Sequence, residues 1–215
     1  IYSWELMNEP EFRLRDIPVP VPCTDPTQPC ITQAQFWDYG SKVSALAHAA
    51  GQRVTVGSAS LKWNKIWTNA YALPRGLPAL NLDYYQTHYY PWMAGQSTND
   101  PVLGVTTWSP LTQNAAALGL DRPIVVGEIC EDAALCAVTN ANVQRDTILA
   151  NGYAGYWPWS YNFNSTGDKF QIQSSYTTWE QAHAALVRIP PPAGATPTVQ
   201  ANTPTRTSTR TATAV

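Results

Sequence analysis

Apolar segments and amphipathic segments alternate along the chain up to about residue 188. Short apolar runs rich in β-branched residues predict strands, and longer stretches with apolar residues at helical spacing predict helices. The predicted strands lie near residues 1–8, 53–57, 82–90, 123–128 and 154–159. The predicted helices lie near residues 32–51, 61–72, 111–118, 132–151 and 176–188.

This alternation is typical of a parallel α/β sheet that is covered by helices. We interpret it as a (β/α)₈ TIM barrel fragment covering roughly the last five strand–helix units, with three units preceding Ile1. A doubly wound open sheet is the alternative, but no Gly-rich phosphate loop follows any predicted strand. Five strands would leave an open edge and an exposed apolar interior, so we expect this piece alone to be insoluble or inactive.

The composition changes after residue 188. Residues 190–192 are all proline, and the rest of the chain is Thr, Pro and Ala with almost no core-forming residues. The sequence therefore predicts a folded domain over residues 1–188 and a disordered linker or tail over residues 189–215. A further module or a cell-envelope attachment could lie beyond this tail.

The four cysteines fall into two close pairs, Cys23 with Cys30 and Cys130 with Cys136. A zinc site is the rival interpretation, but no histidine lies near either pair and neither has the Cys-x-x-Cys spacing. We therefore expect two local disulfides and, from them, an extracytoplasmic, secreted setting.

Composition narrows the classes of partner. The formal net charge is −2 and 13% of the residues are charged, so no basic field indicates nucleic acid. No segment is long and apolar enough to predict a membrane span. The chain has 9 Trp and 11 Tyr against 4 Phe. Most of these rings should be core, but the excess of rings with a polar atom suits a wet, sugar-binding cleft.

Two carboxylates, Glu9 and Glu128, stand where predicted strands end. Pro10 has no backbone N–H and favours an extended conformation for Glu9. Catalytic side chains of a (β/α)₈ barrel gather at this edge. Breaking a glycosidic bond requires one carboxylic acid to protonate the leaving oxygen and one carboxylate to attack the anomeric carbon or activate water. The alternative is that both are solvated loop carboxylates with no shared site.

Other residues could complete such a site. His88 and Tyr90 close a strand and project to the same side because the side-chain period is two. A tyrosine hydroxyl beside a carboxylate stabilises its ionised form. Trp157, at the last strand end, could form the floor of the pocket.

Four motifs carry a resemblance to a known family: WELMNEP at residues 4–10, HYY at 88–90, VVGE at 125–128 and YWPW at 156–159. In order and spacing they resemble the later strands of retaining glycoside hydrolases. The most similar type is family 5, which comprises cellulases and β-mannanases with a (β/α)₈ barrel. The resemblance extends from the first residue to about residue 188.

The resemblance implies a role for each matching residue. Glu9 would be the general acid/base and Glu128 the nucleophile. Asn8 would hydrogen-bond the sugar 2-hydroxyl, and Tyr90 would hydrogen-bond the nucleophile. His88 would lie near the acid/base. Trp157 would be the platform on which the sugar of the cleaved subsite stacks.

These observations predict a retaining endo-β-glycosidase that hydrolyses a β-1,4-linked polysaccharide, mannan or glucan, without a metal or organic cofactor. Carboxyl groups about 5–5.5 Å apart would fit retention, and a separation near 9 Å would fit inversion. A non-catalytic carbohydrate-binding barrel is the alternative from another class. An exo-acting or transglycosylating relative is a third.

Other residues nearby are alternative candidates for these roles. Glu5 lies an even number of residues before Glu9, so both side chains should point to the same side of the predicted strand. Glu5 lies deeper in the barrel than Glu9, so we expect it to support the site. The remaining nearby carboxylates are Glu11, Glu131 and Asp132, and lone carboxylates are usually solvated surface. Among the tryptophans, Trp63 and Trp92 are candidates for outer sugar subsites, and three are expected in the core: Trp37, Trp67 and Trp179.

Overall fold

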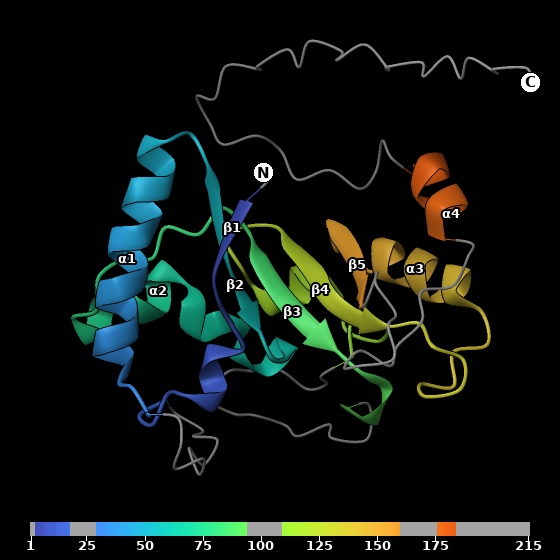
Figure 1. Ribbon diagram of the computed structural model, residues 1–215, viewed down its shortest axis with the longest axis horizontal. Helices are drawn as coiled ribbons and strands as arrows, with labels where there is room; N and C mark the ends of the chain where they lie inside the picture. Colours follow the sequence, from blue (N-terminus) through green and yellow to red (C-terminus); the bar gives the residue numbers. More distant parts are fainter. Residues whose placement is uncertain (1–2, 18–28, 94–108, 160–175, 184–215) are drawn as a thin grey trace, which may run out of the picture.

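Five parallel strands form one sheet in chain order (Figure 1). The computed structural model describes residues 3–17, 29–93, 109–159 and 176–183. The strands are β1 Ser3–Asn8, β2 Arg53–Ser58, β3 Tyr85–Tyr89, β4 Ile124–Cys130 and β5 Gly155–Trp159. The α-helices are α1 Gln33–Ala49, α2 Asn69–Ala72, α3 Ala141–Ala150 and α4 Tyr176–His183. Short 3₁₀ helices connect them: η1 Pro10–Phe12, η2 Leu61–Trp67, η3 Leu73–Arg75, η4 Pro91–Met93 and η5 Ala115–Leu118.

Each strand is hydrogen-bonded to the next one in the sequence, and every pair is parallel. A doubly wound sheet would reverse its strand order at a switch point, which this sheet does not do within the described residues. The α1 and α2 helices lie towards the β1 and β2 side of the sheet, and α3 and α4 lie beside β5 (Figure 1). This arrangement confirms the prediction of a partial (β/α)₈ fold.

The first helix shows why these residues form a covering layer. Thr32 and Gln35 make the reciprocal hydrogen bonds of a capping box, as the sequence predicted. On the buried face of α1, Trp37 stacks on Trp67 with ring centroids 5.1 Å apart. Both rings are buried. Trp37 and Trp67 are therefore core residues, as is Trp179 in α4.

Three helical segments differ from the predictions. Residues 111–118 are helical only over the 3₁₀ helix η5. Residues 61–72 form η2 and then α2, not one continuous α-helix. Residues 132–151 are helical only over Ala141–Ala150. The preceding residues form a turn because Cys130 and Cys136 are joined by a disulfide and Ala137 has a positive φ of 54°. The apolar spacing predicted a longer helix because it carries no information on either constraint.

The sheet face beneath the strand ends carries polar side chains. Gln86, which is buried, donates a hydrogen bond to Glu5 across β2. The strand between them has Gly57 at this level, where a Cβ would lie 2.8 Å from the Glu5 carboxyl carbon. On the other side of Gln86, a Cβ on Gly127 would overlap the Gln86 side chain. Two glycines thus leave room for the Glu5–Gln86 pair.

Alanine at Gly127 is therefore expected to destabilise the fold by about 1–3 kcal/mol, because Gln86 must leave its position. The free energy of unfolding in urea measures this loss. The double variant with Gln86→Ala is the control, since truncating Gln86 removes the overlap. A Gly127→Ala cost that is unchanged in the Gln86→Ala background would contradict this explanation.

Candidate active site

A cavity of about 600 Å³ opens at the carboxyl edge of the sheet. Its lining residues come from β1, β3, β4 and β5: Glu5, Asn8, Gln86, His88, Gly127, Glu128, Trp157 and Trp159. Parallel strands bring their carboxyl ends to one edge, so residues that are far apart in the sequence meet there. Four of the predicted site residues lie in this lining set, and each comes from a different strand: Asn8, His88, Glu128 and Trp157.

Glu9 follows the last residue of β1 in an unusual backbone conformation. The sequence predicted an extended residue before Pro10, but Glu9 has φ 44° and ψ 53°, in the left-handed region. Its N–H donates a 2.6 Å hydrogen bond to the Gly57 carbonyl oxygen. Such a conformation costs on the order of 1–3 kcal/mol for a residue other than glycine. The prediction was wrong because it weighed only the local effect of proline and not this hydrogen bond to β2.

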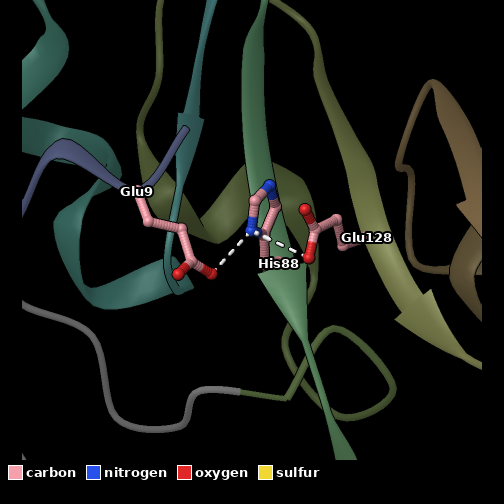
Figure 2. A group of neighbouring side chains, drawn as sticks. All are labelled: Glu9, His88 and Glu128. Atoms are coloured by element: carbon pink, nitrogen blue, oxygen red, sulfur yellow. Dashed lines mark hydrogen bonds and ion pairs between the residues drawn. The ribbon is translucent and has the colours of Figure 1, made fainter. Parts of the chain in front are cut away.

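His88 lies between the two carboxylates (Figure 2). Its Nδ1 is 2.8 Å from Oε1 of Glu9 and 3.4 Å from Oε2 of Glu128. The His88 side chain is 1% exposed. Burial opposes the charged imidazolium, but the hydrogen bond with Glu9 and the charge of Glu128 outweigh it, so the pKa of His88 is raised. His88 is thus a buried link between two acidic groups.

Glu128 has a second partner at the same oxygen. The Tyr90 hydroxyl donates a 2.7 Å hydrogen bond to Oε2 of Glu128. Burial raises the pKa of Glu128, while the charge of His88 and the hydrogen bond from Tyr90 oppose that rise. The side chain is 13% exposed. The Tyr90 hydroxyl and the His88 imidazole therefore both lie at one carboxylate that keeps limited access to solvent.

The two carboxylates are close together. Single ligand atoms of Glu9, His88 and Glu128 all lie within 4.8 Å of one another. This spacing suits direct attack by one carboxylate on a sugar that the other protonates, and it leaves little room for a water between carboxylate and sugar. The same three atoms are also compact enough to hold a metal ion.

Two tryptophans border the cavity. Trp157 packs edge-to-face against Tyr84, with ring centroids 6.2 Å apart. Trp159 also lines the cavity and is 42% exposed. The sequence analysis did not select Trp159, although its spacing of two from Trp157 in β5 places both rings on one face. Trp63 is buried and not among the cavity residues, and the side chain of Trp92 lies outside the described residues.

Three neighbouring acids are buried, contrary to the expectation of solvated surface. Glu131 is fully buried and pairs with Arg145, whose Nε lies 2.7 Å from Oε1, while Tyr156 donates to the same oxygen. Asp132 accepts 2.8 Å hydrogen bonds from the backbone of the turn that follows it. The partners of Glu131 come from α3 and β5, which a local pattern does not identify, whereas those of Asp132 lie two and three residues along the chain.

Glu11 is the third buried acid, in η1 just after Glu9. Its Oε1 accepts a 2.5 Å hydrogen bond from the Ser58 hydroxyl, and its Oε2 accepts a 3.2 Å bond from the Ala59 N–H. Burial raises the pKa of Glu11 to about 7, although these hydrogen bonds oppose the rise. Glu11 thereby ties the segment that carries Glu9 to the end of β2.

The titration of Glu11 predicts how stability depends on pH. Its folded-state pKa of about 7 lies above the ordinary value of 4.5, so the folded protein binds the proton more tightly. The resulting stability is fully present below pH 4.5 and is lost as the pH rises through about 7. Between these pH values the unchanged protein should lose up to ~3 kcal/mol of its free energy of unfolding, and we expect Glu11→Gln to abolish that loss. Urea unfolding of both proteins at several pH values measures it, and parallel pH profiles would contradict it.

The disulfide prediction is confirmed for Cys130 and Cys136. Cys30 is also disulfide-bonded, and Cys23, its predicted partner, lies outside the described residues. The predicted tail, residues 189–215, lies outside them as well. Among the described helices, none has the length and apolar character required to cross a membrane.

Solved structures of beta-mannanases share this fold. The enzyme from Eisenia fetida aligns with a TM-score of 0.56 and 24% identity, covering 83% of this chain and 51% of that chain. The beta-mannanase from the blue mussel Mytilus edulis aligns with a TM-score of 0.53 and 24% identity, covering 76% and 49%. The beta-1,4-mannanase from the sea hare Aplysia kurodai aligns with a TM-score of 0.51 and 23% identity, covering 73% of this chain and 48% of that chain.

The chain thus spans about half the length of these relatives. No protein-family model and no curated protein sequence matches it. At these identities the likeness shows the fold, which is part of a (β/α)₈ barrel.

Proposed function

We propose that this chain carries the catalytic carboxylates of a retaining endo-β-glycosidase that hydrolyses a β-1,4-linked polysaccharide. The observation that carries the proposal is the group of Glu9, His88 and Glu128, with ligand atoms within 4.8 Å of one another at the carboxyl edge of a parallel sheet. Binding a sugar does not need two facing carboxylates, whereas double displacement at an anomeric carbon does.

The reaction proceeds in two steps. Glu128 attacks the anomeric carbon while Glu9 protonates the departing glycosidic oxygen, which leaves a glycosyl-enzyme ester on Glu128. Glu9, now ionised, removes a proton from a water that attacks the same carbon and releases Glu128. Two inversions at one carbon retain its configuration. Tyr90 and His88, which contact Glu128, hold the reactive oxygen in place and favour the ionised form of the carboxylate.

The remaining site residues bind the sugar. Asn8 stands beside Glu9 and lines the cavity, where its amide can hydrogen-bond the 2-hydroxyl of the sugar undergoing substitution. Trp157 presents a ring on which that sugar can stack, and Trp159 extends the aromatic surface along the cavity. This exposed aromatic wall fits an oligosaccharide or polysaccharide better than a small polar ligand.

Mannan is the preferred substrate because three solved structures that share the fold are beta-mannanases. β-1,4-Glucan is the second choice, since the chemistry at the anomeric carbon is the same. Secretion fits the Cys130–Cys136 disulfide and the disulfide-bonded Cys30, because disulfides persist in oxidising compartments.

The test is an assay of reducing-sugar release by a chain that supplies the whole barrel. Mannan, glucomannan, carboxymethylcellulose and β-1,3-glucan serve as substrates, with Glu128→Gln as the control. We expect release from mannan that the control lacks. A folded protein that binds glycan but releases no sugar would favour a carbohydrate-binding barrel instead. Release of single sugars from chain ends would indicate exo action.

A further inference from the structure

A small apolar cluster adjoins the carboxylates. It is separate from the main core and consists of Tyr90, Cys130 and Cys136, which are 8%, 0% and 5% exposed. Met93 and Val138 pack at its margin. The ring of Tyr90 is thus packed with the disulfide between the two cysteines, while its hydroxyl points away towards Glu128.

A closed series of covalent bonds and contacts starts at Glu128 and returns to it. Glu128 precedes Cys130 by two residues in β4, and the disulfide joins Cys130 to Cys136. Tyr90 packs with both cysteines and returns to Glu128 through the 2.7 Å hydrogen bond from its hydroxyl. Tyr90 lies just beyond the end of β3, where sheet hydrogen bonds no longer hold the chain. Packing against the disulfide therefore replaces the sheet in orienting this side chain.

The segment between the cysteines is itself anchored. Asp132 accepts hydrogen bonds from two backbone N–H groups of the turn, and its own carbonyl accepts one of 3.0 Å from the Cys136 N–H. Glu131, next to Cys130, is held by the buried guanidinium of Arg145 in α3. The turn is thus fixed to the body of the protein on one side, and the disulfide fixes Cys136 to β4 on the other.

We propose that the Cys130–Cys136 disulfide is a positioning element for the reaction: it holds Tyr90 in the orientation that hydrogen-bonds the nucleophile Glu128. The inference rests on the proposed function for its effect on rate. Its structural consequence, the hydrogen bond at Glu128, holds whether or not the chain is a glycosidase. Reducing the bond to two thiols, with a dithiol oxidised to its cyclic disulfide, frees Cys136 from β4 and loosens the support of Tyr90.

A double-mutant cycle tests the inference. In a chain with the whole barrel, kcat/KM is measured for the unchanged protein, for Cys130→Ala/Cys136→Ala, for Tyr90→Phe and for the triple variant. We expect removal of the disulfide to lower kcat/KM about 10-fold when Tyr90 is present, as for a weakened hydrogen bond to a charged group. In the Tyr90→Phe background the same removal should change kcat/KM less than 2-fold. Equal losses in both backgrounds would overturn the proposal.

A second readout does not depend on catalysis. The hydrogen bond from Tyr90 lowers the pKa of Glu128, so loss of the disulfide should raise that pKa in the protein with Tyr90 and not in the Tyr90→Phe variant. Carbon-13 NMR of the Glu128 carboxyl across a pH titration measures it. A protein without glycosidase activity that still shows this shift would refute the proposed function and support the positioning role. An unchanged Glu128 pKa on removal of the disulfide would refute the positioning role.

Discussion

Glutamine in place of Glu128 is expected to lower kcat by on the order of 10⁴-fold or more, because an amide cannot form the glycosyl-enzyme ester. The side chain keeps its size, and its amide oxygen can still accept the hydrogen bond from Tyr90. Substrate affinity should therefore change little, and the loss should appear in kcat. Steady-state kinetics on mannan and on an aryl β-glycoside of the matching sugar measure both quantities.

Glu5→Gln is the matched control. Glu5 lines the same cavity, but its carboxylate is hydrogen-bonded by Gln86, whereas Tyr90 and His88 contact Glu128. Its substitution should cost far less than that of Glu128. Glu128→Ala with added azide provides a stereochemical check: azide attacks the substrate once, so the product should be the glycosyl azide of inverted configuration. Glu128→Gln with a tenth or more of the normal kcat would exclude Glu128 as the nucleophile.

Much of this site could be predicted from the sequence because a parallel sheet has a simple geometry. Glu9, His88 and Glu128 each stand at or near the end of an apolar segment, and successive parallel strands bring such ends to one edge. The period of two along a strand indicated that Tyr90 and His88 share a side, and both lie beside Glu128. The roles assigned to these residues stay proposals until activity is measured.

Burial of Glu11 and Glu131 could not be predicted, because it depends on contacts between distant segments. Glu11 looks like a solvated residue in a polar loop, yet Ser58 and Ala59 at the end of β2 supply its hydrogen bonds. Glu131 is buried because Arg145 in the next helix reaches back to it. A single sequence states which residues carry charge, but not which partner offsets the cost of burying that charge.

The backbone of Glu9 shows the same limit. Pro10 disfavours a right-handed helical conformation for the residue before it, which the sequence analysis took to mean an extended strand end. The hydrogen bond from Glu9 to Gly57 instead accompanies a left-handed conformation, which turns the chain from β1 into η1. The side chain of Glu9 consequently reaches His88, a contact that no local rule describes.

The second large effect concerns Glu9, whose replacement by glutamine should depend on the leaving group of the substrate. With mannan, whose leaving oxygen must be protonated, we expect kcat to fall about 10²–10⁴-fold. With a 2,4-dinitrophenyl glycoside, whose phenolate departs unprotonated, formation of the glycosyl-enzyme should be almost unaffected. Glu9→Gln removes the acid but leaves an amide that can hydrogen-bond His88, so packing is preserved.

The second step separates Glu9 from a residue that only supports the fold. Hydrolysis of the glycosyl-enzyme needs a base, so Glu9→Gln should release a burst of dinitrophenol in proportion to enzyme and then turn over slowly. Azide needs no base and should restore turnover, giving the glycosyl azide of retained configuration because Glu128 has already inverted the carbon once. Equal losses on both substrates, with no burst and no azide product, would assign Glu9 a structural role and leave the acid to be sought elsewhere in the cavity.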